Sequence, residues 1–124
     1  MSAHGTVHFN ELNTWEPQKA MAFYGKTLGW AFEEMPGQDG HSYILAKSGD
    51  AVVAGIFTYT SPFFDGASDI WLTYIAVDDI DRRCEAARAA GANIRRPPFD
   101  VPGFGRIAVL DDATGVTLAF IQSL

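Results

Sequence analysis

The stretch that decides the fold is residues 6–13 (TVHFNELN) followed by residues 16–29 (EPQKAMAFYGKTLG), because its pattern recurs later in the chain. The second occurrence is residues 70–77 (IWLTYIAV) followed by residues 79–91 (DIDRRCEAARAAG). In both, an extended apolar segment leads into a helical segment that ends at a glycine. Corresponding positions are separated by roughly 62 to 66 residues, a spacing that indicates two copies of one structural unit.

Three further extended segments follow each predicted helix. After the first helix they are residues 30–36 (WAFEEMP), 42–49 (SYILAKSG) and 51–60 (AVVAGIFTYT). The predicted order is therefore βαβββ, twice. We predict an α+β fold in which two modules, approximately residues 5–60 and 69–124, form a single domain of residues 1–124.

Both predicted helices have recognisable ends. Pro17 suits a first helical turn, which puts Glu16 at the N-cap. Asp78 or Asp79 is expected to cap the second helix, and Gly91 is expected to end it. The residues expected on the packed face of the first helix are Ala20, Phe23, Tyr24 and Leu28.

Composition narrows the functional classes. The chain has 124 residues, is 48% hydrophobic and carries a formal net charge of −6, which fits one compact domain and disfavours nucleic acid and anionic membranes as partners. No apolar run is long enough to cross a bilayer and no secretory signal is recognisable, so we expect a cytoplasmic protein. The single cysteine, Cys84, is interpreted as a buried apolar residue. His4, His8 and His41 are interpreted as structural histidines.

Four motifs, in this order and spacing, resemble a known family. They are NELNT (10–14), AFYGKTLGW (22–30), AVDDID (76–81) and PPFDVPGFGR (97–106). Together they resemble the vicinal oxygen chelate superfamily, also called the glyoxalase, bleomycin-resistance and extradiol-dioxygenase superfamily, and within it a bacterial glyoxalase-like branch. The resemblance implies two modules that form a curved, cup-shaped mixed sheet with the helices on its outer face. Function does not follow from the fold.

The resemblance also bears on metal binding. Metal-dependent members of the superfamily place one ligand each on the first and last strands of both modules. By resemblance these positions are Phe9, Gly55, Leu72 and Ala119. A catalytic divalent ion needs about three nitrogen, oxygen or sulfur ligands, and none of these side chains supplies one. A one-residue slip would bring His8 to the first position but would turn every side chain of that strand over. We therefore expect no metal and no other cofactor.

Glu11 is the candidate catalytic residue. Strand alternation sends Phe9, Glu11 and Asn13 to one side of the first strand, which by resemblance lines the cup. A carboxyl group among aromatic side chains is suited to act as a general acid or base. The alternative is a structural carboxylate, held by backbone groups or by Arg106. Both interpretations stay open.

Aromatic residues make up 13% of the chain, and many lie where they are expected to face the cup. Residues 95–106 (RRPPFDVPGFGR) combine stiff prolines with permissive glycines, which indicates a shaped loop at the mouth or a plain connection. The candidate ligand-binding residues are Phe9, Asn13, Tyr43, Tyr59, Leu72, Tyr74, Phe99, Phe104 and Arg106.

Three functions are compatible with these observations. The first is a metal-free protein that binds a small, mainly apolar or aromatic molecule. The second is a metal-free enzyme in which Glu11 works with Tyr74 or Tyr59 as proton donor. The third is a metal-dependent lyase, isomerase or dioxygenase. Because superfamily members of this length commonly pair modules between chains, the resemblance also implies a homodimer.

Overall fold

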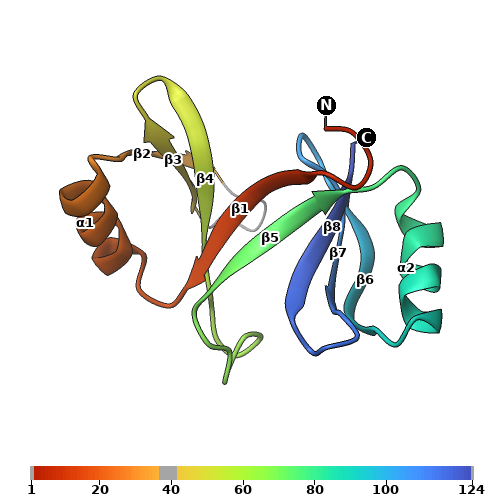
Figure 1. Cartoon of the computed structure of the whole chain (residues 1–124). Coiled ribbons are helices and arrows are strands. Elements are labelled where there is room, and N and C mark those ends of the chain that lie inside the picture. Colours follow the sequence, from red (N-terminus) through yellow and green to blue (C-terminus); the bar gives the residue numbers. More distant parts are fainter. Residues whose placement is uncertain (1, 37–41, 124) are drawn as a thin grey trace. The chain divides into compact units, whose positions relative to one another are not determined.

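The computed structural model describes residues 2–36 and 42–123, and there the element order is βαβββ twice (Figure 1). The strands are β1 (Val7–Thr14), β2 (Ala31–Pro36), β3 (Ser42–Ser48), β4 (Ala51–Thr58), β5 (Ile70–Ala76), β6 (Asn93–Val101), β7 (Gly105–Asp111) and β8 (Thr117–Gln122). The helices are α1 (Pro17–Leu28) and α2 (Ile80–Ala89). Strand order is β2-β3-β4-β1 in the first repeat and β5-β8-β7-β6 in the second. The predicted α+β class and duplicated order are confirmed.

The chain forms two compact units, residues 10–71 and residues 1–9 with 72–124. The unit boundaries divide β1 and β5, so the units do not coincide with the sequence repeats. The first residues join the second unit through backbone hydrogen bonds. The Gly5 N–H donates to the Ala76 carbonyl at 2.7 Å, and the Ala76 N–H donates to the Thr6 carbonyl at 2.9 Å.

In residues 10–71, α1 packs on one face of the strands (Figure 1). The strand residues in this core are Leu12, Ile44 and Ile56, and the helix contributes Ala20, Met21 and Tyr24. Pro17 opens the helix, and Gly29, with a φ of 73°, lets the chain leave it. The prediction that Phe23 and Leu28 face the core is wrong, since they are 58% and 57% exposed. Phe23 lies beside the packed stripe of Ala20, Met21 and Tyr24, whereas Leu28 lies in line with the stripe but is the last residue of the helix.

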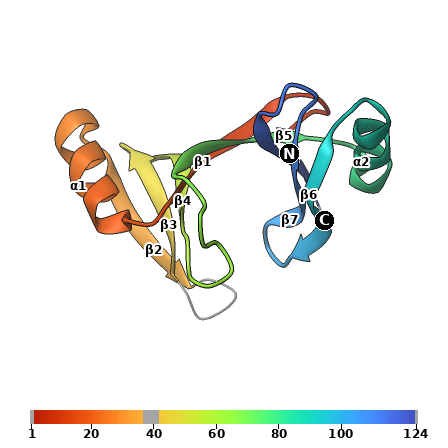
Figure 2. The ribbon, with the colours of Figure 1, turned by 90° about the horizontal axis from the view of Figure 1, so that it is seen from below.

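In the other unit, α2 lies beside β6 and β7 (Figure 2) and packs through Ile80 and Cys84 against Ala108. Asp79 caps the helix by accepting a hydrogen bond from the Arg82 N–H. It is one of the two residues predicted as possible caps. Burial raises the pKa of the Cys84 thiol, which agrees with its interpretation as a buried apolar residue. The last helical residue is Ala89, the C-cap is Ala90, and Gly91 follows with a φ of 102°, as the predicted helix-ending glycine. Neither α1 nor α2 has the length and apolar character needed to cross a membrane.

The proline-rich segment 95–106 is not the predicted loop. Residues 95–101 belong to β6, and only residues 102–104 connect it to β7. β6 is the last strand in its order, and an edge strand tolerates Pro97 and Pro98 because one side of its backbone needs no ladder hydrogen bonds. The pairing register shifts on either side of Arg96, so the prolines are accommodated by irregular pairing.

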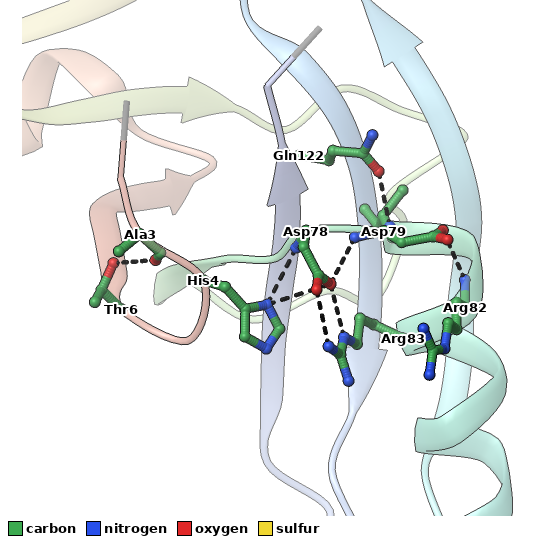
Figure 3. A network of polar contacts seen from close by, with 9 residues as sticks. Ala3, His4, Thr6, Asp78, Asp79, Arg82, Arg83 and Gln122 are labelled. Atoms are coloured by element: carbon green, nitrogen blue, oxygen red, sulfur yellow. Dashed lines mark hydrogen bonds and ion pairs between the residues drawn. The ribbon is translucent and has the colours of Figure 1, made fainter.

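A polar network ties the N-terminal residues to the start of α2 (Figure 3). Arg83 donates to both carboxylate oxygens of Asp78, at 2.8 and 2.9 Å. His4 Nδ1 accepts a hydrogen bond from the Asp78 N–H at 3.1 Å. The Arg83 guanidinium holds the pKa of the Asp78 carboxyl group well below its usual value of 3.8.

We expect Asp78→Asn to lower the melting temperature near neutral pH. A carboxyl group whose pKa is depressed by folding stabilises the protein above its unfolded pKa, and this contribution is lost as pH falls below 3.8 toward the folded value. The melting temperatures of wild type and Asp78→Asn should therefore converge in acid. Asp50→Asn, at an exposed turn, is the control. A difference between wild type and Asp78→Asn that persists undiminished at the lowest pH would contradict this assignment.

Candidate functional site

The candidate site lies on the strand face of residues 10–71 that points away from α1. Leu12 and Ile56 face α1, so the alternation of strands turns their neighbours Glu11 and Gly55 to the opposite side. The register places Glu11 directly opposite Gly55, across the parallel pair of β1 and β4. Asn13 lies opposite Phe57 on the same face. The strands therefore bring a carboxyl group, an amide and an aromatic ring together.

Glu11 is the centre of this group and is only 4% exposed. The Tyr43 hydroxyl donates to Glu11 Oε2 at 2.6 Å, and Asn13 Nδ2 donates to Glu11 Oε1 at 2.9 Å. Both of these donors are neutral. Hydrogen bonds to an ionised group are the stronger kind, and they compensate the loss of water around a buried carboxylate. We call Glu11, Asn13, Tyr43 and Gly55 the Glu11 cluster.

Gly55 makes the contact between Tyr43 and Glu11 possible. A Cβ atom at position 55 would lie 1.8 Å from Tyr43 Oη and 2.6 Å from Tyr43 Cζ, far inside van der Waals contact. The tyrosine ring on β3 therefore crosses β4 over the space that a side chain would fill. In the sequence, Gly55 stood out only as one of the positions at which metal-dependent members carry a ligand, and this role was not predicted. A glycine inside a strand is the signal, because it often marks a close approach by another group.

Aromatic rings border the Glu11 cluster within the same unit. Phe57 contacts Phe64 with ring centroids 5.4 Å apart, and Phe64 contacts Tyr59 at 5.2 Å. Neither Phe57 nor Phe64 was predicted as a site residue. The Tyr59 hydroxyl donates to the Ser68 carbonyl at 2.9 Å, so the phenol seen to donate to Glu11 is that of Tyr43.

A second aromatic group lies in the unit of residues 1–9 and 72–124. The Phe9 and Tyr74 rings stack with centroids 4.6 Å apart, and Phe104 meets Phe9 edge-on at 5.4 Å. Tyr74 lies opposite Ala119 in the pairing of β5 and β8. Leu72, two residues before Tyr74 on the same strand face, is 3% exposed. Three predicted ligand-binding residues, Phe9, Tyr74 and Phe104, are thus brought together.

The last two predicted residues have partners within that unit. Phe99 lies on β6, where the Arg96 guanidinium sits 3.7 Å above its ring. Arg106 donates to Asp81 at 3.1 Å and to Asp100 at 2.9 Å. These two carboxylates raise the pKa of the Arg106 guanidinium. The arginine therefore joins β7 to α2 and β6.

Two of the three histidines are described, and one of them adjoins the second aromatic group: the His8 ring meets Phe9 edge-on with centroids 5.4 Å apart. His8 is exposed, and its Nδ1 atom is 2.7 Å from Ser2 Oγ. His4 belongs to the network around Asp78. His41 lies outside the described residues.

The pattern of the whole chain identifies its family. The model of the Glyoxalase/Bleomycin resistance protein/Dioxygenase superfamily matches residues 5–120, nearly the full length. The chain belongs to this superfamily.

Relatives of known name share part or all of this domain. The chain is 37% identical over 118 residues to the Mycobacterium bovis protein "Putative glyoxylase CFP32", a match that covers 95% of the chain and 44% of the relative. It is 27% identical to the anthracycline biosynthesis protein DnrV of Streptomyces peucetius, over 94% of the chain and 46% of the relative. A "Probable lactoylglutathione lyase" of Vibrio parahaemolyticus is 26% identical, over 98% of the chain and 93% of the relative. The chain thus spans less than half the length of the first two.

Solved structures show the same fold. A hypothetical protein from Bacillus halodurans superimposes with a TM-score of 0.71 at 16% identity, over 98% of this chain and 96% of the other. Methylmalonyl-CoA epimerase from Mycobacterium tuberculosis gives a TM-score of 0.61 at 18% identity, over 100% of this chain and 93% of the other. At these identities the likeness concerns the fold.

The residues present do not fit the metal site of the superfamily's metal-dependent members. Phe9 stacks on Tyr74, Leu72 and Ala119 carry no donor atom in their side chains, and the space at Gly55 is filled by the Tyr43 phenol. Within residues 2–36 and 42–123, no three His, Cys, Asp or Glu side chains come together. We therefore derive no chemical step through a metal.

We predict that Gly55→Ala will destabilise the protein by about 1–3 kcal/mol, because the added methyl group collides with the Tyr43 ring. Gly25→Ala is the matched control, because a Cβ atom at that position would lie 3.7 Å or more from its neighbours. The substitution also replaces a glycine inside a helix by a better helix former. That control should be neutral or stabilising. Chemical denaturation measures both.

The collision is specific to Tyr43, so the two positions should be coupled. In a Tyr43→Ala background, Gly55→Ala should cost much less, because the ring that it meets is gone. Equal costs of Gly55→Ala in the two backgrounds would show that Gly55 does not make room for Tyr43.

Proposed function

We propose that this protein binds a small, mainly apolar or aromatic molecule, without a metal ion, on the strand face that carries the Glu11 cluster. The observation that carries the proposal is the Tyr43 phenol above Gly55. The Tyr43 ring, which belongs to β3, fills the space where metal-dependent members carry a ligand on β4. Its hydroxyl group donates a hydrogen bond to Glu11. A ligand then meets a carboxyl–phenol pair bordered by aromatic rings.

The surroundings of the cluster support this proposal. Phe57 and Phe64 are half-buried, so part of each ring remains available for contact. Ligand sites commonly combine aromatic walls with a few fixed polar groups, and the Glu11 cluster supplies the polar part. The names of the relatives, which concern glyoxylase, lyase and biosynthetic proteins, point to small-molecule chemistry. The net charge of −6 argues against a nucleic-acid partner.

An acid–base enzyme is the second candidate, favoured by one observation. Tyr43 Oη lies 2.6 Å from Glu11 Oε2, within the range in which a proton passes between an acid and a base. Glu11 would accept a proton from a bound substrate, and Tyr43 would hold the carboxyl group in place. A recovered ligand that differs from the one added would favour this candidate over simple binding. The metal-dependent alternative ranks third because its ligand positions carry no donors.

The test of the metal-free proposal uses naphthylmethanol, a neutral aromatic probe. We expect saturable binding when the titration is monitored through amide chemical shifts, and we expect the largest shift changes around Tyr43, Phe57 and Phe64. Binding should be unchanged by EDTA, because no metal takes part. About one equivalent of a transition metal in protein purified without chelator, together with loss of binding in EDTA, would contradict the proposal.

We also propose a homodimer. Large apolar side chains are exposed on α1, where Phe23 and Leu28 lie, and a second subunit is one way in which such surface is covered. Two of the relatives are more than twice as long as the region that matches this chain, so their chains have room for a second domain of the same size, a place that a second subunit would take here. Light scattering at tens of micromolar, as an order of magnitude, should give twice the chain mass of 13.5 kDa. A monomer at that concentration would contradict the dimer without affecting the binding proposal.

A further inference from the structure

The connection between β4 and β5, residues 59–69, is folded by turns of its own. The Phe64 N–H donates to the Thr60 carbonyl at 3.1 Å, and the Ala67 N–H donates to the Phe64 carbonyl at 2.9 Å. The Asp65 N–H donates to the carbonyl two turns' residues earlier, at Pro62, at 3.2 Å. Hydrogen bonds that follow one another at this spacing define the path of the backbone. We call this segment the β4–β5 loop.

Side chains from β4 and from the end of β1 hold the second half of the β4–β5 loop. The Trp15 indole N–H donates to the Ala67 carbonyl at 2.8 Å, and the Tyr59 hydroxyl donates to the Ser68 carbonyl at 2.9 Å. The Asp69 carboxylate accepts a hydrogen bond from the Trp15 backbone N–H at 3.1 Å. A ligand that contacts this loop therefore does not have to order it first, which lowers the entropic cost of binding.

A contiguous row of phenylalanine rings runs from the face of the Glu11 cluster into the β4–β5 loop. Phe57 lies opposite Asn13, on the strand face of Glu11. Phe64 meets Phe57 edge-on with centroids 5.4 Å apart, and Phe63 meets Phe64 edge-on at 4.8 Å. Phe63 is 74% exposed. A single exposed apolar side chain is common on protein surfaces, but Phe63 extends a row of rings that begins beside the proposed ligand position.

We infer that Phe63 is a specificity-determining residue of the proposed site, and that through it the site selects aromatic ligands with more than one ring. This inference rests on the proposed function and specifies its ligand class. The polar end of the ligand lies at the Tyr43–Glu11 pair, and its ring system extends past Phe57 toward Phe63. Because favourable apolar contact grows with the area removed from water, a second ring gains affinity where the row of rings offers it a surface.

The test compares phenylmethanol with naphthylmethanol, two neutral alcohols that differ by one fused ring. Dissociation constants are measured by chemical-shift titration for wild type and Phe63→Ala. We expect Phe63→Ala to weaken the binding of naphthylmethanol about fivefold or more, because its second ring loses a partner. The binding of phenylmethanol should change by less than about twofold.

Phe23→Ala is the matched control. It removes the same side chain from a position that is 58% exposed on α1, which packs on the other strand face. Both dissociation constants should be unchanged in this variant. A loss of naphthylmethanol binding in Phe23→Ala as large as in Phe63→Ala would show that the probe responds to exposed rings in general, and would overturn the inference.

The remaining outcomes separate the inference from the proposed function. If neither alcohol binds wild type, both are overturned. If Phe63→Ala binds naphthylmethanol as well as wild type does, or weakens both probes alike, the aromatic site stands and the selection through Phe63 is wrong. A variant that becomes monomeric and keeps its affinity for naphthylmethanol would assign Phe63 to a subunit interface instead. A Phe63→Ala protein that does not fold would also overturn the inference, since the ring would then serve the core.

Discussion

The hydrogen bond from Tyr43 to Glu11 is possible only because Gly55 has no side chain. Without the space above β4, the phenol could not reach across the sheet, and the buried carboxyl group would lose a donor. An intramolecular hydrogen bond contributes about 0.5–1.5 kcal/mol, so this contact matters for stability as well as for the site. The Glu11 cluster is therefore built from three strands, and a change in any one of them alters it.

The same contact occupies one of the positions that metal-dependent members of the superfamily use for a ligand. The superfamily fold brings the first and last strands of a module side by side, and metal-dependent members use that proximity for ligands. Here the register of β1 and β4 pairs Glu11 with Gly55, and the phenol from β3 fills the space between them. In the proposed function, neutral donors hold the carboxylate and the carboxylate meets the ligand.

Much of the fold was predictable because it rests on local and periodic signals. Pro17 and Asp79 mark helix starts, and the repeat established the duplicated order. The packed face of α1 was predicted too broadly, because an apolar pattern does not show how wide a stripe of the helix, or how much of its length, the sheet covers. The strand through Pro97 and Pro98 was missed because edge position is a property of the whole sheet and not of the segment.

Less of the site was predictable. Strand alternation placed Glu11 and Asn13 on one side of β1, where the structure joins them by a hydrogen bond. Their partner Tyr43 is 32 residues from Glu11, and only the pairing of β3 with β4 brings its ring over Gly55. Cross-strand contacts of this kind depend on which strands pair and where they pair, and this is a property of the whole sheet that the segment around Tyr43 does not reveal by itself.

The most direct test of metal-free binding at the Glu11 cluster is a crystal structure of protein purified without chelator and soaked with naphthylmethanol. We predict density for the probe beside Tyr43, Glu11 and Phe57, with the Tyr43–Glu11 hydrogen bond retained. A metal ion bound by strand residues of this face, or a probe seated away from Glu11, would contradict it.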